Sequence, residues 1–427
     1  MRSLRSKAFA SNEFLAQGLL VFASSVVVNG FNYVFHILNS RALGVAHYGE
    51  LSSLISVLMI ALIPAGIGAT VVTKFAAEFH AVGDLPKLRT LTLRVLWISA
   101  GAAAAIVLLT VIFGAAIAHF LGISEVLAVD LTALLIACNT AVLMLRGLLQ
   151  GAHDFRAFAI SNSLEAVLKA ALGVGLVVVG YGLDGAFGGM SIGCVIATVY
   201  TIYVTLNNVR VRAERLRVDV RRLAQTMIGS IVAASAFPIL AFADVIAVKH
   251  YLDAQQSGLY GAMTLWGKII WFAVSFIPQI VLPKAASRAL AGQNVLSILL
   301  QAGAIGVAIS LFGVALCAFA PALIIRAVAG PAFVAIAPLL LPYAIGISLL
   351  GLANVAISYK IGIHRFDYVW PLCATVAAEL VGFAFFHQTT VDIVRVVVAA
   401  DALAFGVSLW RIWLPGLRYA GAAATAA

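Results

Sequence analysis

The stretch ISAGAAAAIVLLTVIFGAAIA, residues Ile98 to Ala118, decides the class of fold because it contains no charged residue. A helix of about 20 residues is about 30 Å long, which is the thickness of the hydrocarbon core of a bilayer. Similar runs recur along all 427 residues, and the chain is 63% hydrophobic and 10% charged, against roughly 25% charged residues in soluble domains. Lipid-exposed backbone must satisfy its own hydrogen bonds within helices. The sequence therefore predicts an all-α integral membrane protein.

The apolar runs predict twelve membrane-spanning helices. They cover about residues 15–39, 49–73, 92–119, 126–149, 157–180, 184–207, 226–249, 257–283, 295–320, 334–358, 366–386 and 391–413. Basic residues test this count, because lysine and arginine gather in cytoplasmic loops. With a cytoplasmic N-terminus, 21 of the 27 basic residues fall at the inside ends of spans and four at the outside ends. We expect both termini to be cytoplasmic, and the net charge of +10 to report topology rather than nucleic-acid binding.

An internal repeat divides the chain. Gly151-Ala152-His153-Asp154-Phe155 recurs 211 residues later as Gly362-Ile363-His364-Arg365-Phe366, after the fourth span of each half. Three glycine pairs recur at offsets of 208 or 209 residues: Gly49 with Gly258, Gly83 with Gly292, and Gly122 with Gly330. Halves with an even number of spans cross the membrane in the same sense, so their pseudo-two-fold axis lies along the membrane normal. We predict two pseudo-symmetric six-helix lobes, residues 1–208 and 226–427, joined by a basic cytoplasmic linker at 209–225.

The sequence lacks two common signatures of catalysis and cofactor binding. There is no H-E-x-x-H and no phosphate-binding loop. The glycine-rich residues 182–189 are expected to form a tight connection between two spans, and the four cysteines to be packing residues. We therefore expect a protein that is not an enzyme and has no bound cofactor or metal. Two like halves around a cleft are typical of alternating-access carriers.

The first span carries a polar face. Its members recur at steps of three and four residues and therefore share one side of a helix: Asn29, Asn32, Tyr33, His36, Asn39 and Ser40. Because a polar face toward lipid is costly, it should either line a water-filled cavity or hydrogen-bond to a neighbouring helix.

Charged residues in the interior of the predicted spans include Glu165, Lys169, Asp244, Lys268, Glu379 and Asp401. Glu165 and Lys169 are four residues apart and are expected to pair on one helix face. Asp244 and Lys268 occupy successive spans and could face each other, either lining a translocation path or forming an ion pair that fixes packing. Prolines at 64, 238 and 278 are expected to interrupt the second, seventh and eighth spans.

Several segments resemble a known family. The stretch Arg41-Ala42-Leu43-Gly44-Val45-Ala46-His47-Tyr48-Gly49 resembles the R-x-L-G-x-x-x-Y/F-G stretch after the first helix of polysaccharide exporters. Those exporters belong to the multidrug/oligosaccharidyl-lipid/polysaccharide (MOP) exporter superfamily. Ser257-Gly258-Leu259-Tyr260 looks like the matching stretch of the second half, and Ala329-Gly330-Pro331-Ala332-Phe333 is similar to the ninth-to-tenth connection. The resemblance implies a MATE-like fold and covers nearly the whole chain.

The resemblance also implies a function. It implies a flippase of the bacterial inner membrane that moves an oligosaccharide on polyprenyl diphosphate, for surface polysaccharide or O-antigen, between leaflets by alternating access. Lys268, with Arg41, Arg146 or Lys284, would contact the diphosphate, while Asn29, Asn32, Tyr33, His36 and Asp244 would line the cavity. Membrane lipids and glycan polymerases or glycosyltransferases are the expected partners. An ion-coupled multidrug antiporter and a non-transporting scaffold for glycan assembly remain the alternatives.

Overall fold

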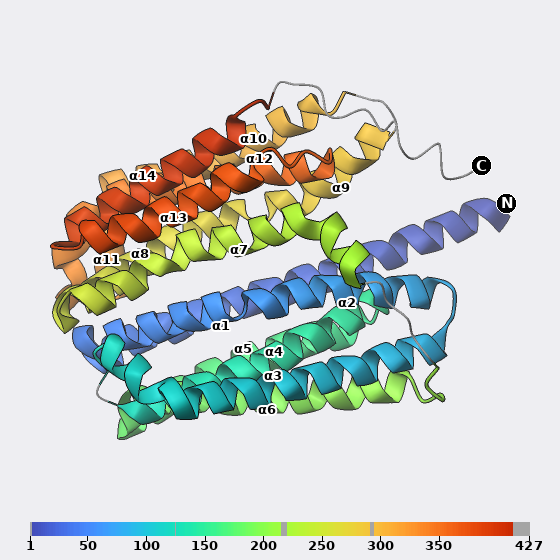
Figure 1. The fold of residues 1–427 in the computed structure, drawn as a ribbon, viewed down its shortest axis with the longest axis horizontal. Coiled ribbons are helices and arrows are strands. Elements are labelled where there is room, and N and C mark those ends of the chain that lie inside the picture. The colour runs from blue at the N-terminus through green and yellow to red at the C-terminus, as the bar shows by residue number, and fades with distance from the viewer. Residues whose placement is uncertain (1, 124, 215–219, 291–293, 413–427) are drawn as a thin grey trace. The chain divides into compact units, whose positions relative to one another are not determined.

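Helices make up nearly all of the described structure. The computed structural model describes residues 2–123, 125–214, 220–290 and 294–412, and these segments contain no strand. The elements in chain order are α1 (Arg2–Ala61), α2 (Ile63–Ala81), α3 (Leu85–Phe120), α4 (Val126–Gly151), α5 (Phe155–Leu176), the π-helical turn η1 (Val177–Tyr181), α6 (Gly182–Asn208), α7 (Val220–Tyr251), α8 (Ala254–Val274), α9 (Ile277–Leu290), α10 (Leu296–Phe319), α11 (Pro321–Val328), the 3-10 helix η2 (Pro331–Ile336), α12 (Ala337–Gly362), α13 (Val369–Phe385) and α14 (Thr390–Leu409). Within each half, the long helices lie side by side (Figure 1).

The described residues contain the twelve predicted crossings. Eight helical stretches are long and apolar enough to span a membrane. Two of them contain two crossings each, because the backbone leaves helical geometry at Gly44, with φ of 73° and ψ of 179°, and at Gly180, with φ of 107°. Glycine adopts such positive φ values without a steric penalty. The shorter α13 and the more polar α14 complete the twelve, so the predicted all-α, twelve-helix fold is confirmed.

The second span of each half is broken near its middle. In the first half α1 ends at Ala61 and α2 begins at Ile63, and in the second half α8 ends at Val274 and α9 begins at Ile277. Pro64 and Pro278 lie in the first turn that follows each break, where a missing N–H removes no helical hydrogen bond. By contrast, α7 continues as one helix through Pro238, and a kink there stays a prediction.

The G-x-H-x-F repeat has one geometry in both halves. His153 and His364 both adopt left-handed backbone conformations, with φ of 59° and 54°. The backbone N–H groups of Asp154 and Arg365 each donate to the carbonyl five residues earlier, at 2.8 Å. This hydrogen bond closes a helix through a left-handed residue. The sequence repeat is therefore a repeated helix-ending motif, at the ends of α4 and α12.

The glycine of each motif allows a close helix contact. A Cβ atom on Gly151 would lie 2.5 Å from the carbonyl oxygen of Thr73 on α2, and one on Gly362 would lie 2.8 Å from that of Leu282 on α9. Any larger side chain would push the helices apart. The end of the fourth span thus packs on the broken second span in both halves.

The glycine-rich residues 182–189 differ from the prediction. The turn falls at Gly180 and Gly182, which have positive φ, and the residues after it already belong to α6. Gly189 faces the backbone of Gly173 on α5 at a distance that leaves no space for a Cβ atom. These glycines therefore mainly bring α5 and α6 into close contact.

Packing divides the chain into two compact units. The first contains Met1–His47 and Ala61–Val218, and the second contains Tyr48–Ile60 and Asp219–Ala427. The segment 48–60 joins the second unit through an ion pair of 3.5 Å between Glu50 and Lys249 and an edge-to-face contact of Tyr48 with Phe333. The predicted lobe boundaries, 208 and 226, stay a prediction, and residues 215–219 of the predicted linker lie outside the described residues.

Candidate functional site

Asp244 lies at the centre of a buried polar cluster in the second unit. Its Oδ2 accepts hydrogen bonds from the hydroxyls of Tyr260 and Tyr343, both at 3.0 Å. The backbone N–H of Val245 donates to Oδ1 at 2.8 Å, and the Nζ atom of Lys268 lies 3.7 Å from the same oxygen. Helices α7, α8 and α12 therefore meet at one carboxylate. The predicted proximity of Asp244 and Lys268 is confirmed as an ion pair.

Lys268 has a second partner. Its ammonium group lies 4.3 Å from the centre of the Phe242 ring, a distance at which a cation is attracted to the face of an aromatic ring. The residue is buried on α8. The ammonium is therefore held between a carboxylate and an aromatic ring inside the unit.

Two further carboxyl groups belong to this cluster. Glu379 on α13 and Asp401 on α14 are 1% and 0% exposed, and no group of the described residues hydrogen-bonds to any of their four carboxyl oxygens. Both interact electrostatically with Asp244. Gly346 on α12 leaves space beside Asp401, since a Cβ atom there would lie 3.2 Å from Asp401 Oδ2. We call Asp244, Lys268, Glu379 and Asp401 the acid cluster.

The acid cluster carries more negative than positive groups. Three carboxyls share one lysine inside a membrane-spanning unit, and an unpaired buried charge is very unfavourable. Protons or a bound cation must therefore balance the excess. Among the residues that the structure describes, no three Asp, Glu, His or Cys side chains are arranged as ligands of one metal ion.

Glu379 and Asp401 were recognised in the sequence as charges inside spans, but not as candidate site residues. The signal was present as acids inside the seventh, eleventh and twelfth spans, namely Asp244, Glu379 and Asp401. Helices α7, α13 and α14 pack on one another, which hydropathy alone does not indicate. Of the two tyrosines that bond to Asp244, Tyr260 ends the stretch 257–260 that resembles the exporters, whereas Tyr343 carried no distinguishing sequence pattern.

A second buried network lies in the first unit. The guanidinium group of Arg146 donates to the hydroxyl and the carbonyl of Ser161, at 2.9 and 2.8 Å, and pairs with Glu165 at 2.7 Å. The Ser161 hydroxyl also hydrogen-bonds to Thr201 at 2.7 Å, so the network joins α4, α5 and α6. The predicted pairing of Glu165 with Lys169 is wrong, because Arg146 reaches the carboxylate from a neighbouring helix.

The polar face of the first span makes protein contacts. Asn32 Oδ1 accepts a hydrogen bond of 3.0 Å from Lys169, whose ammonium also lies 4.9 Å from the Phe35 ring. Asn39 is buried, and its amide donates to the carbonyl of Phe35 in its own helix. At Asn32 the predicted interhelical hydrogen bond is thus observed.

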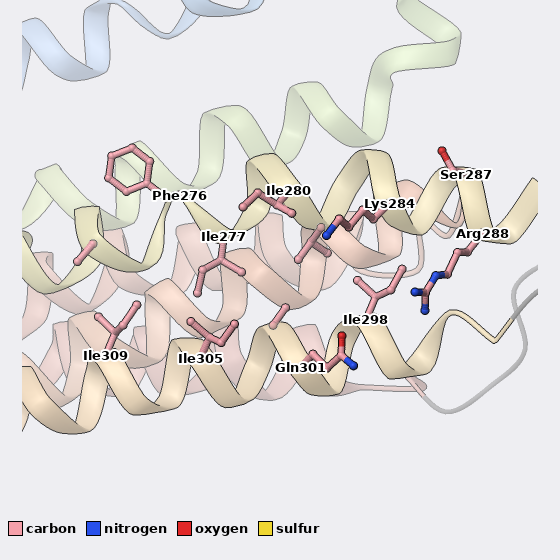
Figure 2. Close-up of a pocket in the computed structure, with 13 residues that line it drawn as sticks. Phe276, Ile277, Ile280, Lys284, Ser287, Arg288, Ile298, Gln301, Ile305 and Ile309 are labelled. Carbon is pink, nitrogen blue, oxygen red and sulfur yellow. The ribbon is translucent and has the colours of Figure 1, made fainter. Parts of the chain in front are cut away.

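The other candidates from the sequence are located on α1 and α9. Asn29 and Arg41 are exposed, while Tyr33 and His36 are half-buried on α1. Lys284 lies on α9 in a groove that α9 forms with α10 (Figure 2). A substrate role for each of these five residues stays a prediction.

Comparison with solved structures identifies the fold. An inward-facing multidrug resistance MATE family transporter of the MOP superfamily matches with a TM-score of 0.71 and 16% identity, covering 90% of this chain and 94% of that one. The lipid II flippase MurJ in an inward closed conformation matches with a TM-score of 0.67 and 13% identity, covering 93% and 87%. A eukaryotic MATE transporter gives a TM-score of 0.56 and 11% identity, covering 94% and 96%. The chain therefore has the fold of the MOP superfamily.

The sequence itself is similar to one protein family. The family described as polysaccharide biosynthesis protein matches residues 14–284, which is more than half of the chain. The chain belongs to this family, and the resemblance to polysaccharide exporters is confirmed. No sequence among the curated proteins matches the chain.

Proposed function

We propose that this protein is a flippase that moves an oligosaccharide on polyprenyl diphosphate from the inner to the outer leaflet of a bacterial plasma membrane. The observation that carries the proposal is membership of the polysaccharide biosynthesis family, on a fold shared with a lipid II flippase. Sugars and a diphosphate cross hydrocarbon only at great cost, because their polar groups lose water. A protein path lowers this cost while the prenyl chain stays in lipid.

In this proposal the two units alternate access to the two sides of the membrane, with both termini cytoplasmic. An ion drives such a cycle only if its affinity differs between the two conformations. The acid cluster supplies carboxyl groups for that purpose, two of them without a hydrogen-bond donor among the described residues. A proton needs one carboxyl oxygen, whereas a metal ion needs several converging ligands. We therefore propose protons as the coupling ion.

The contacts in the structure support other proposed roles for two of the basic residues. Lys268 neutralises part of the acid cluster through Asp244, and Arg146 joins three helices through Ser161 and Glu165. Both then act on the protein rather than on the diphosphate. Arg41, which is exposed near the end of the first span, remains a proposed diphosphate contact.

Deletion of the gene tests the function. The proposal predicts that lipid-linked glycan accumulates in the cytoplasmic leaflet and that the wild-type gene restores its export. Glu379→Gln and Asp401→Asn should fail to restore it at normal protein levels, while Glu78→Gln, which changes an exposed acid on α2, should restore it. Glycan that reaches the outer leaflet at the wild-type rate in the deletion strain would contradict the proposal, and shortened surface chains in that case would indicate a scaffold.

An ion-coupled multidrug antiporter is the second candidate. It is favoured by the acid cluster and by the TM-score of 0.71 to a multidrug transporter. Increased dye retention in the deletion strain, with unchanged glycan, would select it. For either function, proteoliposomes with a pH gradient or a sodium gradient identify the ion, and transport driven by sodium alone would contradict proton coupling.

A further inference from the structure

The groove between α9 and α10 combines apolar walls with a basic end. Its volume is about 630 Å³ (Figure 2). Helix α9 contributes Ile277, Ile280, Lys284, Ser287 and Arg288, at intervals that place these residues on one helix face. The face therefore changes along the helix axis from hydrocarbon to polar and cationic groups.

Helix α10 forms the opposite wall of the groove. Ile309 and Ile305 face the apolar part of the groove, and Gln301 lies nearer the basic end (Figure 2). Both helices therefore supply apolar walls, while the cations at the basic end come from α9. A ligand that fits must carry an apolar chain at one end and a polar group at the other.

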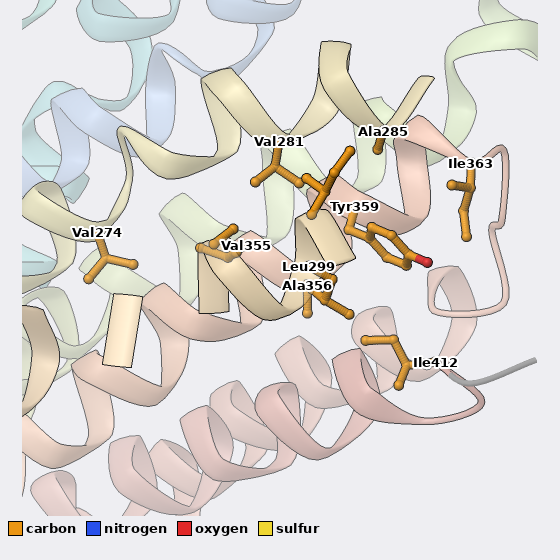
Figure 3. Close-up of a cluster of buried hydrophobic side chains, with 11 residues drawn as sticks. Val274, Val281, Ala285, Leu299, Val355, Ala356, Tyr359, Ile363 and Ile412 are labelled. Carbon is orange, nitrogen blue, oxygen red and sulfur yellow. The ribbon is translucent and has the colours of Figure 1, made fainter. Parts of the chain in front are cut away.

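The floor of the groove is well packed. Val281, Ile298 and Ala302 line it and also belong to a buried hydrophobic cluster that includes Val274 and Val355 (Figure 3). Close packing keeps such a floor in one shape. The concave surface therefore exists before a ligand arrives.

The rim of the groove is apolar and open. Ile280 and Ile305 are 56% and 57% exposed, and Phe276 is 49% exposed. In a membrane-spanning unit, exposed aliphatic side chains are compatible with contact to lipid chains. The groove can therefore accept a chain from the bilayer without displacing protein.

The basic end lacks a balancing acid. Lys284 and Arg288 are both exposed, four residues apart, and the thirteen residues that line the groove include no Asp or Glu. Like charges at this spacing repel. Arg288 donates to the hydroxyl of Ser297 at 3.0 Å, which leaves its positive charge uncompensated. An anion between the two side chains would remove this repulsion.

The length of the groove indicates the occupant. From Ile277 to Arg288 a helix advances about 17 Å, slightly more than half of a hydrocarbon core of roughly 30 Å. Charge and length together match a lipid that stays within one leaflet. We propose that the groove binds an anionic phospholipid, with its phosphate between Lys284 and Arg288 and one acyl chain along the isoleucines. Basic pockets between membrane helices bind acidic headgroups in this manner.

The headgroup part of the proposal can be tested with the full-length purified protein. Native mass spectrometry would compare phosphatidylglycerol with phosphatidylcholine of the same acyl chains. We expect at least tenfold tighter binding of phosphatidylglycerol. Each of Lys284→Gln and Arg288→Gln should weaken it about fivefold. Lys74→Gln, which removes an exposed cation from α2, should leave it unchanged.

The acyl-chain part needs a second pair of variants. Ile305→Trp should fill the groove and abolish phosphatidylglycerol binding, whereas Leu311→Trp, at an equally exposed position of α10 outside the groove, should not. Thermal unfolding checks that both variants are folded, and the charge variants decide the matter if Ile305→Trp is not. Equal binding of the two phospholipids, unchanged binding in the charge variants, or tighter binding of polyprenyl phosphate than of phosphatidylglycerol would each overturn the proposal. The test measures lipid binding alone, so its outcome is independent of the proposed glycan transport.

Discussion

Replacing Lys268 by methionine tests how the acid cluster is held together. The substitution keeps most of the side-chain volume and removes the only cation from the cluster. Asp244 then keeps its hydrogen bonds from Tyr260, Tyr343 and a backbone N–H, but it loses its ion pair.

The geometry gives the size of the effect. The Lys268 and Asp244 side chains are 8% and 1% exposed, with 3.7 Å between Nζ and Oδ1. Removal of one partner from a buried ion pair costs about 3–5 kcal/mol, because the other charge is left buried and unpaired. Since three hydrogen-bond donors remain at the carboxylate, we expect about 3 kcal/mol, at the lower end of this range.

A double-mutant cycle isolates the contribution of the pair. Equilibrium unfolding of the purified protein in mixed micelles would give the stability of Lys268→Met, Asp244→Asn and the double variant. The double variant should be more stable than the sum of the single losses predicts, by about 2 kcal/mol. Arg395→Met is the matched control, because its ion pair with Asp392 is exposed, and it should cost less than about 1 kcal/mol.

Two results would refute this reasoning. If Lys268→Met were as stable as Arg395→Met, the buried ion pair would contribute nothing. If the losses in the cycle were additive, the two residues would act independently. Either outcome would require another source for the compensation of the Asp244 charge.

Three further predictions concern packing, coupling and the first unit. In the same unfolding assay, Gly362→Ala should lower the free energy of unfolding by about 1–3 kcal/mol, because the added Cβ atom would collide with α9. The control is Gly101→Ala, whose Cβ atom would have nothing within 4 Å. It should leave the free energy of unfolding unchanged or raise it by up to about 1 kcal/mol. Glu379→Gln and Asp401→Asn should preserve stability but abolish the response of transport in proteoliposomes to a pH gradient; a full response would exclude these carboxyls as proton sites. Arg146→Lys should cost about 2–4 kcal/mol, because it loses two of three bonds in a buried network, and a loss under 1 kcal/mol would contradict that role.

Much of the fold could be predicted from the sequence. Hydropathy and the alternation of basic loops predict the twelve spans. Each span needs an apolar stretch as long as the hydrocarbon core is thick and basic residues on its cytoplasmic side, and these two requirements act on each span separately. The repeat could also be found, since the left-handed turns at His153 and His364 depend on local sequence. These features need no knowledge of which helices are neighbours.

The candidate site was harder to predict because it depends on neighbours. The four-residue spacing along one helix predicted an ion pair between Glu165 and Lys169. In the structure, Glu165 instead forms an ion pair with Arg146, which lies on another helix. Glu379 and Asp401 are more than twenty residues apart in the chain, and they approach Asp244 only through the packing of α7, α13 and α14. A single sequence contains no record of that packing.

The segment 48–60 has a consequence for biogenesis. It belongs to the second unit although it is made with the first, and Lys249 follows its partner Glu50 by 199 residues. At about 5–20 residues per second, a ribosome needs roughly 10–40 s to synthesise that interval. During this time Glu50 exists without its final partner. The contacts of residues 48–60 with the second unit can therefore form only after that part of the second half has been synthesised.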